Sequence, residues 1–185
     1  MKNCNSIWVP IEYKSSYMDC DKQGIRLHFN DIEINKSLRN HCIKYCRWLR
    51  KKYIFPIRCN IHFEYHPYYR DSGKKSGNSN AIFYYQKSDN LSNVSRYPKI
   101  RIAVSEFEKL VKTFPEDNIL FHYLHLISHE LTHYFQWYFF ENDERTKRSL
   151  EIEANRWADY LTRTYMNQVY YKEIQCNIDY GDGVN

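Results

Sequence analysis

Apolar residues first follow a clear pattern between residues 30 and 53. Ile34, Leu38, Ile43 and Trp48 recur at intervals of four and five residues, as they do in a helix. An Asn-Asp pair ahead of them is typical of a helix start. The pattern predicts a first long helix in this part of the chain.

Three segments with strand-like character follow this helix. "PIRCNIHFEY" alternates apolar and polar residues from Ile57 to Tyr65, which is the period of a strand with one buried face. "AIFYYQK" is rich in β-branched and aromatic residues, and "RYPKIRIAV" alternates again from Ile100 to Val104. The polar, glycine-containing residues 70–80 lie between the first two and predict a flexible loop.

Helical spacing returns in the last part of the chain. It predicts a short helix to about Phe114, a break at Pro115, a long helix over about 117–139 and another over about 147–166. Residues 172–185 are expected to form a tail. A helix, a small sheet and then further helices indicate an α+β protein, and 185 residues favour a single domain spanning 1–185.

Composition supports a globular protein. The chain is 43% hydrophobic with only 5 Gly and 5 Pro, which argues against disorder and against a loop-rich disulfide scaffold. The amino-terminal residues lack the apolar run of a secretory signal, and no window approaches the roughly 18 apolar residues of a membrane span. We therefore expect a cytoplasmic protein.

The cysteines show no disulfide framework, and in a reducing compartment they are expected to be free thiols. Two of them share a helix face and a third could lie nearby, which leaves a thiolate metal site as the less favoured alternative to ordinary buried cysteine. Those three are Cys42, Cys46 and Cys59, and the others are Cys4, Cys20 and Cys176.

The net charge of +5 is modest. Its densest basic run lies in the first predicted helix, from Lys44 to Lys52, and could make weak contact with nucleic-acid phosphates. The commoner explanation of such a run is the solvated face of a helix.

The segment "HELTH" carries the candidate chemistry. His129 and His133 are four residues apart, so on a helix they share one face and their imidazoles can converge on one ion such as zinc. Glu130 points about 100° around the helix, beside the metal, where its carboxylate can take a proton from a zinc-bound water. A catalytic zinc site has three protein ligands, so a third is required.

Two downstream carboxylates qualify by type as that ligand, Glu151 and Glu153. Glu151 shares its helix face with Ala154 and Ala158, and such short side chains let two helices approach closely. We therefore expect Glu151 to be the third ligand. Asn155 follows one turn later, where its side chain can hydrogen-bond a ligand and fix the ligand's orientation.

These residues carry a family resemblance. HELTH at 129–133, followed by "EIEAN" at 151–155, resembles the HExxH and ExxAN pair of the ImmA/IrrE family of zinc metallopeptidases. The resemblance implies His129, His133 and Glu151 as zinc ligands, one zinc ion per chain, and Glu130 as general base. It implies a zincin-like domain with an N-terminal helix, a small, mainly antiparallel sheet, the HExxH helix and a following helix that carries the third ligand.

Other polar residues lie near the motif. His125 precedes His129 by one turn and could be a further ligand, but a buried, hydrogen-bonded role next to the site is favoured. Four tyrosines could donate to an oxyanion, although packing is the default for each. They are Tyr134, Tyr138, Tyr160 and Tyr165.

The preferred function is a zinc-dependent intracellular endopeptidase that cuts a specific protein, with Glu130 as general base. The resemblance adds that relatives often occur in phages and mobile elements and cleave a repressor. The alternative is a DNA- or partner-binding protein on a zincin fold, whose zinc is structural or vestigial. An intact Glu130 argues against this alternative, because a structural site needs no general base.

The segment 97–104 is a candidate for holding the substrate. It starts near a proline and carries Lys99 and Arg101, features that edge strands use against uncontrolled pairing. An extended peptide could add to such an edge as another strand, beside Arg101, Ile102 and Ala103. A position inside the sheet is the equally weighted alternative.

Overall fold

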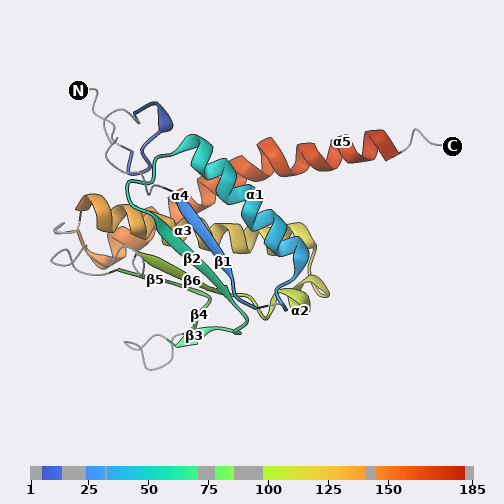
Figure 1. Cartoon of the computed structure of the whole chain (residues 1–185), viewed down its shortest axis with the longest axis horizontal. Coiled ribbons are helices and arrows are strands. Elements are labelled where there is room, and N and C mark those ends of the chain that lie inside the picture. Colours follow the sequence, from blue (N-terminus) through green and yellow to red (C-terminus); the bar gives the residue numbers. More distant parts are fainter. Residues whose placement is uncertain are drawn as a thin grey trace.

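A four-stranded sheet with helices on one of its faces forms the body of the protein (Figure 1). This computed structural model describes residues 6–13, 24–31, 33–70, 78–85, 98–140 and 145–181. The fold is mixed α/β. Within the described ranges no helix has the length and apolar character needed to cross a membrane.

The sheet has the order β1-β2-β6-β5. Its strands are β1 (Ile25–Phe29), β2 (Cys59–Glu64), β6 (Lys99–Ala103) and β5 (Ala81–Tyr84). The prediction of a mainly antiparallel sheet is wrong, because β1 pairs with β2 and β2 with β6 in parallel, and only β5 runs antiparallel. One of the two parallel pairs is made by β1, which the sequence pattern did not predict. It precedes the first helix, so this helix becomes a crossover between parallel strands.

The edge assignment of β6 is also wrong. β6 pairs with β2 on one side and with β5 on the other, so Arg101, Ile102 and Ala103 lie inside the sheet and cannot receive a further strand. Tyr97 lies outside the described residues. The charges that suggested an edge belong to the sheet's helix-free face. There Arg101 Nε donates to both carboxylate oxygens of Glu64 at 2.9 Å, and Lys99 lies over the ring of Tyr84.

A short hairpin flanks the predicted loop over 70–80. It consists of β3 (Tyr69–Arg70) and β4 (Asn78–Ser79), which pair antiparallel. The loop prediction itself falls mainly on residues 71–77, which lie outside the described residues.

The first helix is α1 (Lys36–Lys52), and the side chain of Asn35 caps it by accepting from the amides of Ser37 and Leu38. Cys42 and Cys46 on α1 and Cys59 on β2 are buried in the core, and burial raises the pKa of all three thiols. No group of metal-ligating side chains among the described residues includes a cysteine. Cys4 and Cys20 lie outside those residues.

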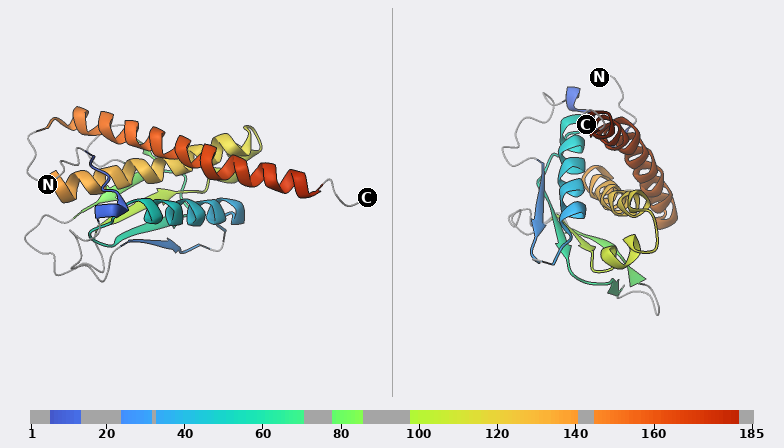
Figure 2. Two further views of the ribbon diagram at one scale, coloured as in Figure 1. Left: turned by 90° about the horizontal axis from the view of Figure 1, so that it is seen from above. Right: turned by 90° about the vertical axis from the view of Figure 1, so that its right-hand side faces the viewer.

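The remaining helices form two layers over the sheet (Figure 2). After the short α2 (Phe107–Val111), α3 (Glu116–Phe140) packs beside α1 against the sheet, and α4 (Lys147–Tyr165) lies on α3. α4 continues through a π-helical segment, η3 (Met166–Tyr170), into α5 (Tyr171–Gly181). The predicted tail from 172 is helical as far as residue 181, and this helix extends away from the body (Figure 1).

The amino-terminal segment packs on the back of α3. Trp8 is fully buried, its ring lies 4.7 Å from that of Phe135, and its Nε1 donates to Thr132 Oγ1 at 3.1 Å. Leu131 and Thr132 are fully buried as well. Leu131 and Thr132 thus anchor the helix in the core. His129, Glu130 and His133 are the residues of HELTH that remain for a functional site.

Candidate metal centre

The centre is built where α3 and α4 cross. Ala154 and Ala158 of α4 are completely buried at this contact, so the two backbones can come close. Glu151 lies on the same face of α4, one turn before Ala154, and is carried toward the histidines of α3. The alanine-lined face thus positions the carboxylate as the sequence pattern predicted.

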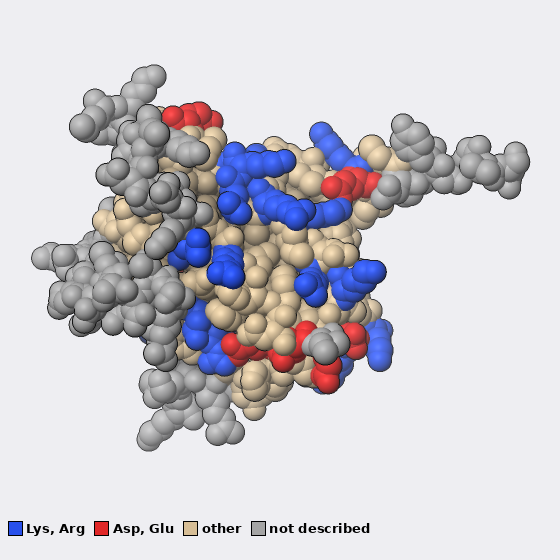
Figure 3. All heavy atoms as spheres, viewed as in Figure 1, with Lys and Arg blue, Asp and Glu red and all other residues tan. Residues whose placement is uncertain are grey.

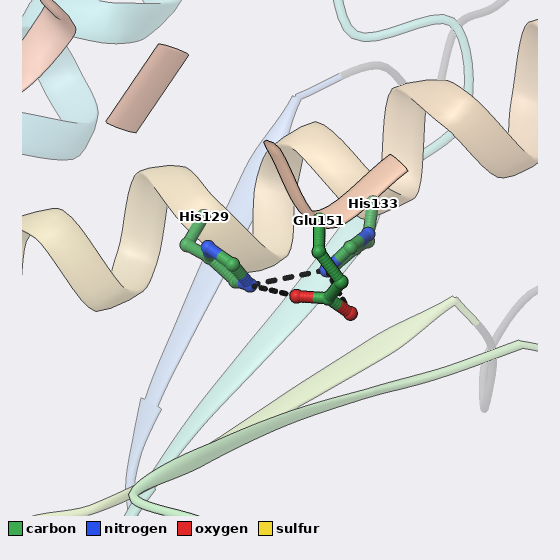
Figure 4. A group of neighbouring side chains, drawn as sticks. All are labelled: His129, His133 and Glu151. Carbon is green, nitrogen blue, oxygen red and sulfur yellow. Dashed lines mark hydrogen bonds and ion pairs between the residues drawn. The ribbon is translucent and has the colours of Figure 1, made fainter. Parts of the chain in front are cut away.

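The structure brings His129, His133 and Glu151 together, with their possible ligand atoms all within 4.8 Å of one another. The Nε2 atoms of the two histidines are 3.1 Å apart. Glu151 Oε2 lies 3.4 Å from His129 Nε2, and Oε1 lies 3.5 Å from His133 Nε2. Figure 4 shows the carboxylate pointing between the two imidazoles.

These separations fit one small ion. Tetrahedral ligands at the usual zinc distances of about 2.0–2.2 Å lie about 3.3–3.5 Å from one another. The Nε2–Nε2 separation of 3.1 Å comes close to one such edge, and the two oxygens of the Glu151 carboxylate lie at similar distances, Oε2 3.4 Å from His129 and Oε1 3.5 Å from His133. Two imidazole nitrogens and one carboxylate therefore fit a divalent metal and leave a fourth position for water or substrate.

His129 is held in a form that can bind a metal. Its Nδ1 lies 3.1 Å from Asn155 Oδ1, so a proton on Nδ1 is donated to the amide oxygen and Nε2 keeps its lone pair. Burial and the neighbouring His133 lower the pKa of His129 to about 4, which keeps this imidazole neutral near pH 7. Asn155 thus lies where the sequence pattern predicted a partner of a ligand.

His133 has an equivalent partner that was not predicted from the sequence. Its Nδ1 lies 2.7 Å from Gln136 Oε1, while Gln136 Nε2 donates at 2.9 Å both to Leu150 O and to Glu153 Oε2. Those last two atoms only accept hydrogen bonds, so the amide nitrogen must face them and its oxygen must face His133. The i,i+3 spacing from His133 to Gln136 was the available sign of this contact.

Glu153, the other carboxylate considered, is occupied elsewhere. Besides Gln136 it accepts from Arg145 Nη1 at 2.9 Å. It therefore supports His133 through Gln136 and does not join the ligand group.

Glu130 is 7% exposed and lies next to the ligand group. Burial, assisted by the carboxylate of Glu151, raises the pKa of Glu130 to about 8, and a hydrogen bond with the backbone of Phe83 opposes this rise. A divalent cation beside it would also favour the ionised carboxylate. Glu130 therefore has the burial and the tunable proton affinity of a proton-transfer group.

The other predicted site residues lie further from the centre. Within the described chain, His125 contacts His129 by ring stacking at 6.4 Å and forms no hydrogen bond with it. Tyr134 exchanges hydrogen bonds with the backbone of Ile57, at 2.8 and 3.0 Å, so its hydroxyl is committed to the core. Tyr160 is 56% exposed and Tyr165 is buried. Arg101, Ile102 and Ala103 remain inside the sheet, as described above.

Comparison of the chain with models of known families, with curated proteins and with solved structures gave no match. The functional interpretation therefore rests on the three possible metal ligands, His129, His133 and Glu151, and on the buried Glu130 beside them.

Proposed function

We propose that the protein is a zinc-dependent endopeptidase of the zincin type. The observation that carries the proposal is the ligand triangle of His129, His133 and Glu151 with a buried carboxylate, Glu130, beside it. Two nitrogen donors and one carboxylate with an open position are the ligand set of catalytic zinc in several peptidases. The resemblance of HELTH and EIEAN to the ImmA/IrrE metallopeptidases supports the same reaction.

In this proposal the bound zinc supplies Lewis-acid activation of the scissile carbonyl. Glu130 takes a proton from the attacking water on its carboxylate and then passes it to the nitrogen of the leaving amine. Asn155 and Gln136 hold the two imidazoles with Nε2 directed at the centre, so that little reorganisation is needed.

The substrate would add to β5 and not to β6. β5 is the terminal strand beside α3. Ala103 N donates to Asn80 O, so alternation directs the backbone groups of Ile82 and Tyr84 toward β6 and those of Phe83 outward. The contact between the Phe83 backbone and Glu130 places this outer side next to the proposed base. An extended peptide paired there would present its carbonyls to the centre.

The proposal is tested by separating metal binding from turnover. Purified protein is incubated with lysate of its source cell, with and without chelator, and new peptide termini are mapped. We expect about one zinc per chain, loss of zinc in His133→Ala and Glu151→Ala, and chelator-sensitive cleavage. Glu130→Gln should keep its zinc and lose about 10²- to 10⁴-fold in rate, because only the proton transfer is removed.

Glu153→Gln tests the other candidate carboxylate, which lies outside the ligand group and contacts His133 through Gln136. It should retain zinc at saturating concentration. Zinc lost from Glu153→Gln and kept by Glu151→Ala would reject the ligand assignment, and unchanged turnover of Glu130→Gln would reject the mechanism. Zinc bound by the wild type without any cleavage would favour the binding-protein alternative.

A further inference from the structure

The positive charge of the protein is concentrated in one helix. α1 contains seven of the 27 Lys and Arg residues and none of the 22 Asp and Glu residues. The other 168 residues therefore carry 20 basic and 22 acidic side chains, a small negative excess. The net charge of +5 therefore comes from α1, because the rest of the chain is slightly acidic.

The cations of α1 lie on its outward side. Its apolar side is buried in the core through Leu38, Cys42, Tyr45, Cys46 and Leu49. At 100° per residue, the exposed basic side chains fall within one wide stripe on the opposite side. The stripe comprises Lys36, Arg39, Lys44, Arg47, Arg50 and Lys51, and runs about 25 Å along the helix. Figure 3 shows Lys and Arg gathered over this part of the surface.

Few of these cations are neutralised by neighbours in the described ranges of the chain. Lys44 pairs with Glu173 at 2.5 Å, and Arg39 lies over the ring of Phe29. Among the residues that the structure describes, Arg47, Arg50 and Lys51 have no ion-pair partner. Within the described part of the chain, the C-terminal half of the stripe therefore presents three cations without an ion-pair partner over five positions.

We propose that α1 binds the phosphate backbone of double-stranded nucleic acid, without reading its sequence. A duplex carries one negative charge per about 1.7 Å of its axis, so a 25 Å basic stripe faces many phosphates at once. Arginine, which supplies three of the six cations of the stripe, can bind phosphate through two parallel hydrogen bonds.

Other anionic partners fit the helix less well. A helix that lies in a membrane surface inserts an apolar face, but that face of α1 is buried in the core, and none of the exposed large hydrophobic residues belongs to α1. A single strand is usually held by exposed aromatic rings that stack on its bases. Tyr45 is buried, and Trp48 is half-buried under Lys52.

The stripe is separate from the metal centre. α1 packs against β1 at one edge of the sheet, whereas the helix of the metal ligands packs against β5 at the other. A duplex on α1 would leave the centre open. The proposal therefore does not depend on the proposed peptidase activity.

The test measures fluorescence anisotropy of labelled DNA and RNA duplexes of about 30 base pairs, with the full chain, between about 50 and 200 mM salt. The variant Arg47→Gln/Arg50→Gln/Lys51→Gln is compared with Lys109→Gln/Lys112→Gln/Lys147→Gln. The second variant loses the same charge at exposed positions outside α1. Circular dichroism establishes that both are folded, and Glu130→Gln shows whether binding is independent of catalysis.

We expect log K for the wild type to fall linearly with log salt. The α1 variant should weaken binding by about tenfold or more at the lower salt and reduce the slope by about 2 to 3, one unit for each phosphate that is no longer neutralised. The control variant should change affinity by less than about twofold, and Glu130→Gln should bind like the wild type. Equal losses of affinity in the two triple variants, or no binding by the wild type, would overturn the proposal. Tighter binding to vesicles of anionic lipid than to either duplex would overturn it too.

Discussion

At the scale of single residues, Gln136 decides which nitrogen of His133 faces the metal centre. Its amide cannot turn over, because its nitrogen donates to Leu150 O and Glu153 Oε2, neither of which can donate in return. Its oxygen therefore accepts from His133 Nδ1, which leaves the lone pair on Nε2. Arg145 holds Glu153 from the other side. The orientation of one ligand thus depends on a chain of contacts across two helices.

Replacing Gln136 with Leu removes the acceptor for His133 Nδ1 while keeping a side chain of similar size. We expect zinc affinity to fall by about 10- to 100-fold, the usual effect of losing a partner that orients a ligand. A competition titration against a chromophoric chelator measures it. Gln168→Leu, an exposed change in η3, should leave the affinity unaltered. The same affinity in Gln136→Leu as in the wild type would show that the contact does not orient His133.

Glu130 should make stability depend on pH. Its pKa in the folded protein is raised to about 8, above the value of about 4.3 in an unfolded chain. Between these values the unfolded state has released its proton and the folded state has not. The free energy of unfolding therefore falls as pH rises, by about 1.4 kcal/mol per pH unit from this group, until the pH passes about 8.

Gln cannot ionise, so Glu130→Gln should escape this loss. In the presence of chelator, urea unfolding should show little difference between variant and wild type near pH 4 to 5. Toward pH 8 the free energy of unfolding of the variant should increasingly exceed that of the wild type. An advantage that does not change with pH would contradict the raised pKa.

At the scale of elements, the sequence predicted features that depend on neighbouring residues, such as helices and strands. Helical periodicity predicted both ends of α3 and α4 within about one residue, and the alternation of β2 and β6 identified both strands. The start of α1 was predicted too early, because Asn35 caps the helix and not the Asn-Asp pair at 30–31. Strand order was not predictable in the same way, because it depends on contacts between distant segments. The charges of Lys99 and Arg101 are compatible with an edge and with an exposed sheet face, and the pairing partners of β6 decided between them.

The central position of β6 predicts the effect of proline at residue 101. Arg101 is opposite Ile82, in the set of pairs whose backbone groups join β6 to β5. Arg101→Pro removes a ladder donor inside the sheet, so we expect a loss of about 3 to 4 kcal/mol or failure to fold. Arg101→Ala keeps the ladder donor and loses the ion pair with Glu64 and the contact with the Tyr69 ring, which should cost about 1 to 2 kcal/mol. Thermal unfolding compares them, and equal melting temperatures would contradict the assigned pairing.

At the scale of the whole molecule, the candidate site was more predictable than the fold around it. His129, His133 and Glu151 lie within 23 residues on two consecutive helices, so helical periodicity and the alanine-lined face of α4 were enough to predict that they meet. Other contacts of the helix α3 are made by residues that are distant from it in the sequence. The backbone of Phe83 on β5 and the indole of Trp8 on the back of α3 both required the tertiary fold.

The contact between Trp8 and Thr132 also orders events during synthesis. The two residues are 124 positions apart, so Trp8 leaves the ribosome long before its acceptor exists. At about 5–20 residues per second this interval lasts about 6–25 s. Throughout it, the indole has at most Tyr53 and Phe55 to pack on, and its contacts with Phe135 and Thr132 cannot form. The segment around Trp8 therefore completes its packing only after α3 has been synthesised, and chaperones have that interval in which to bind it.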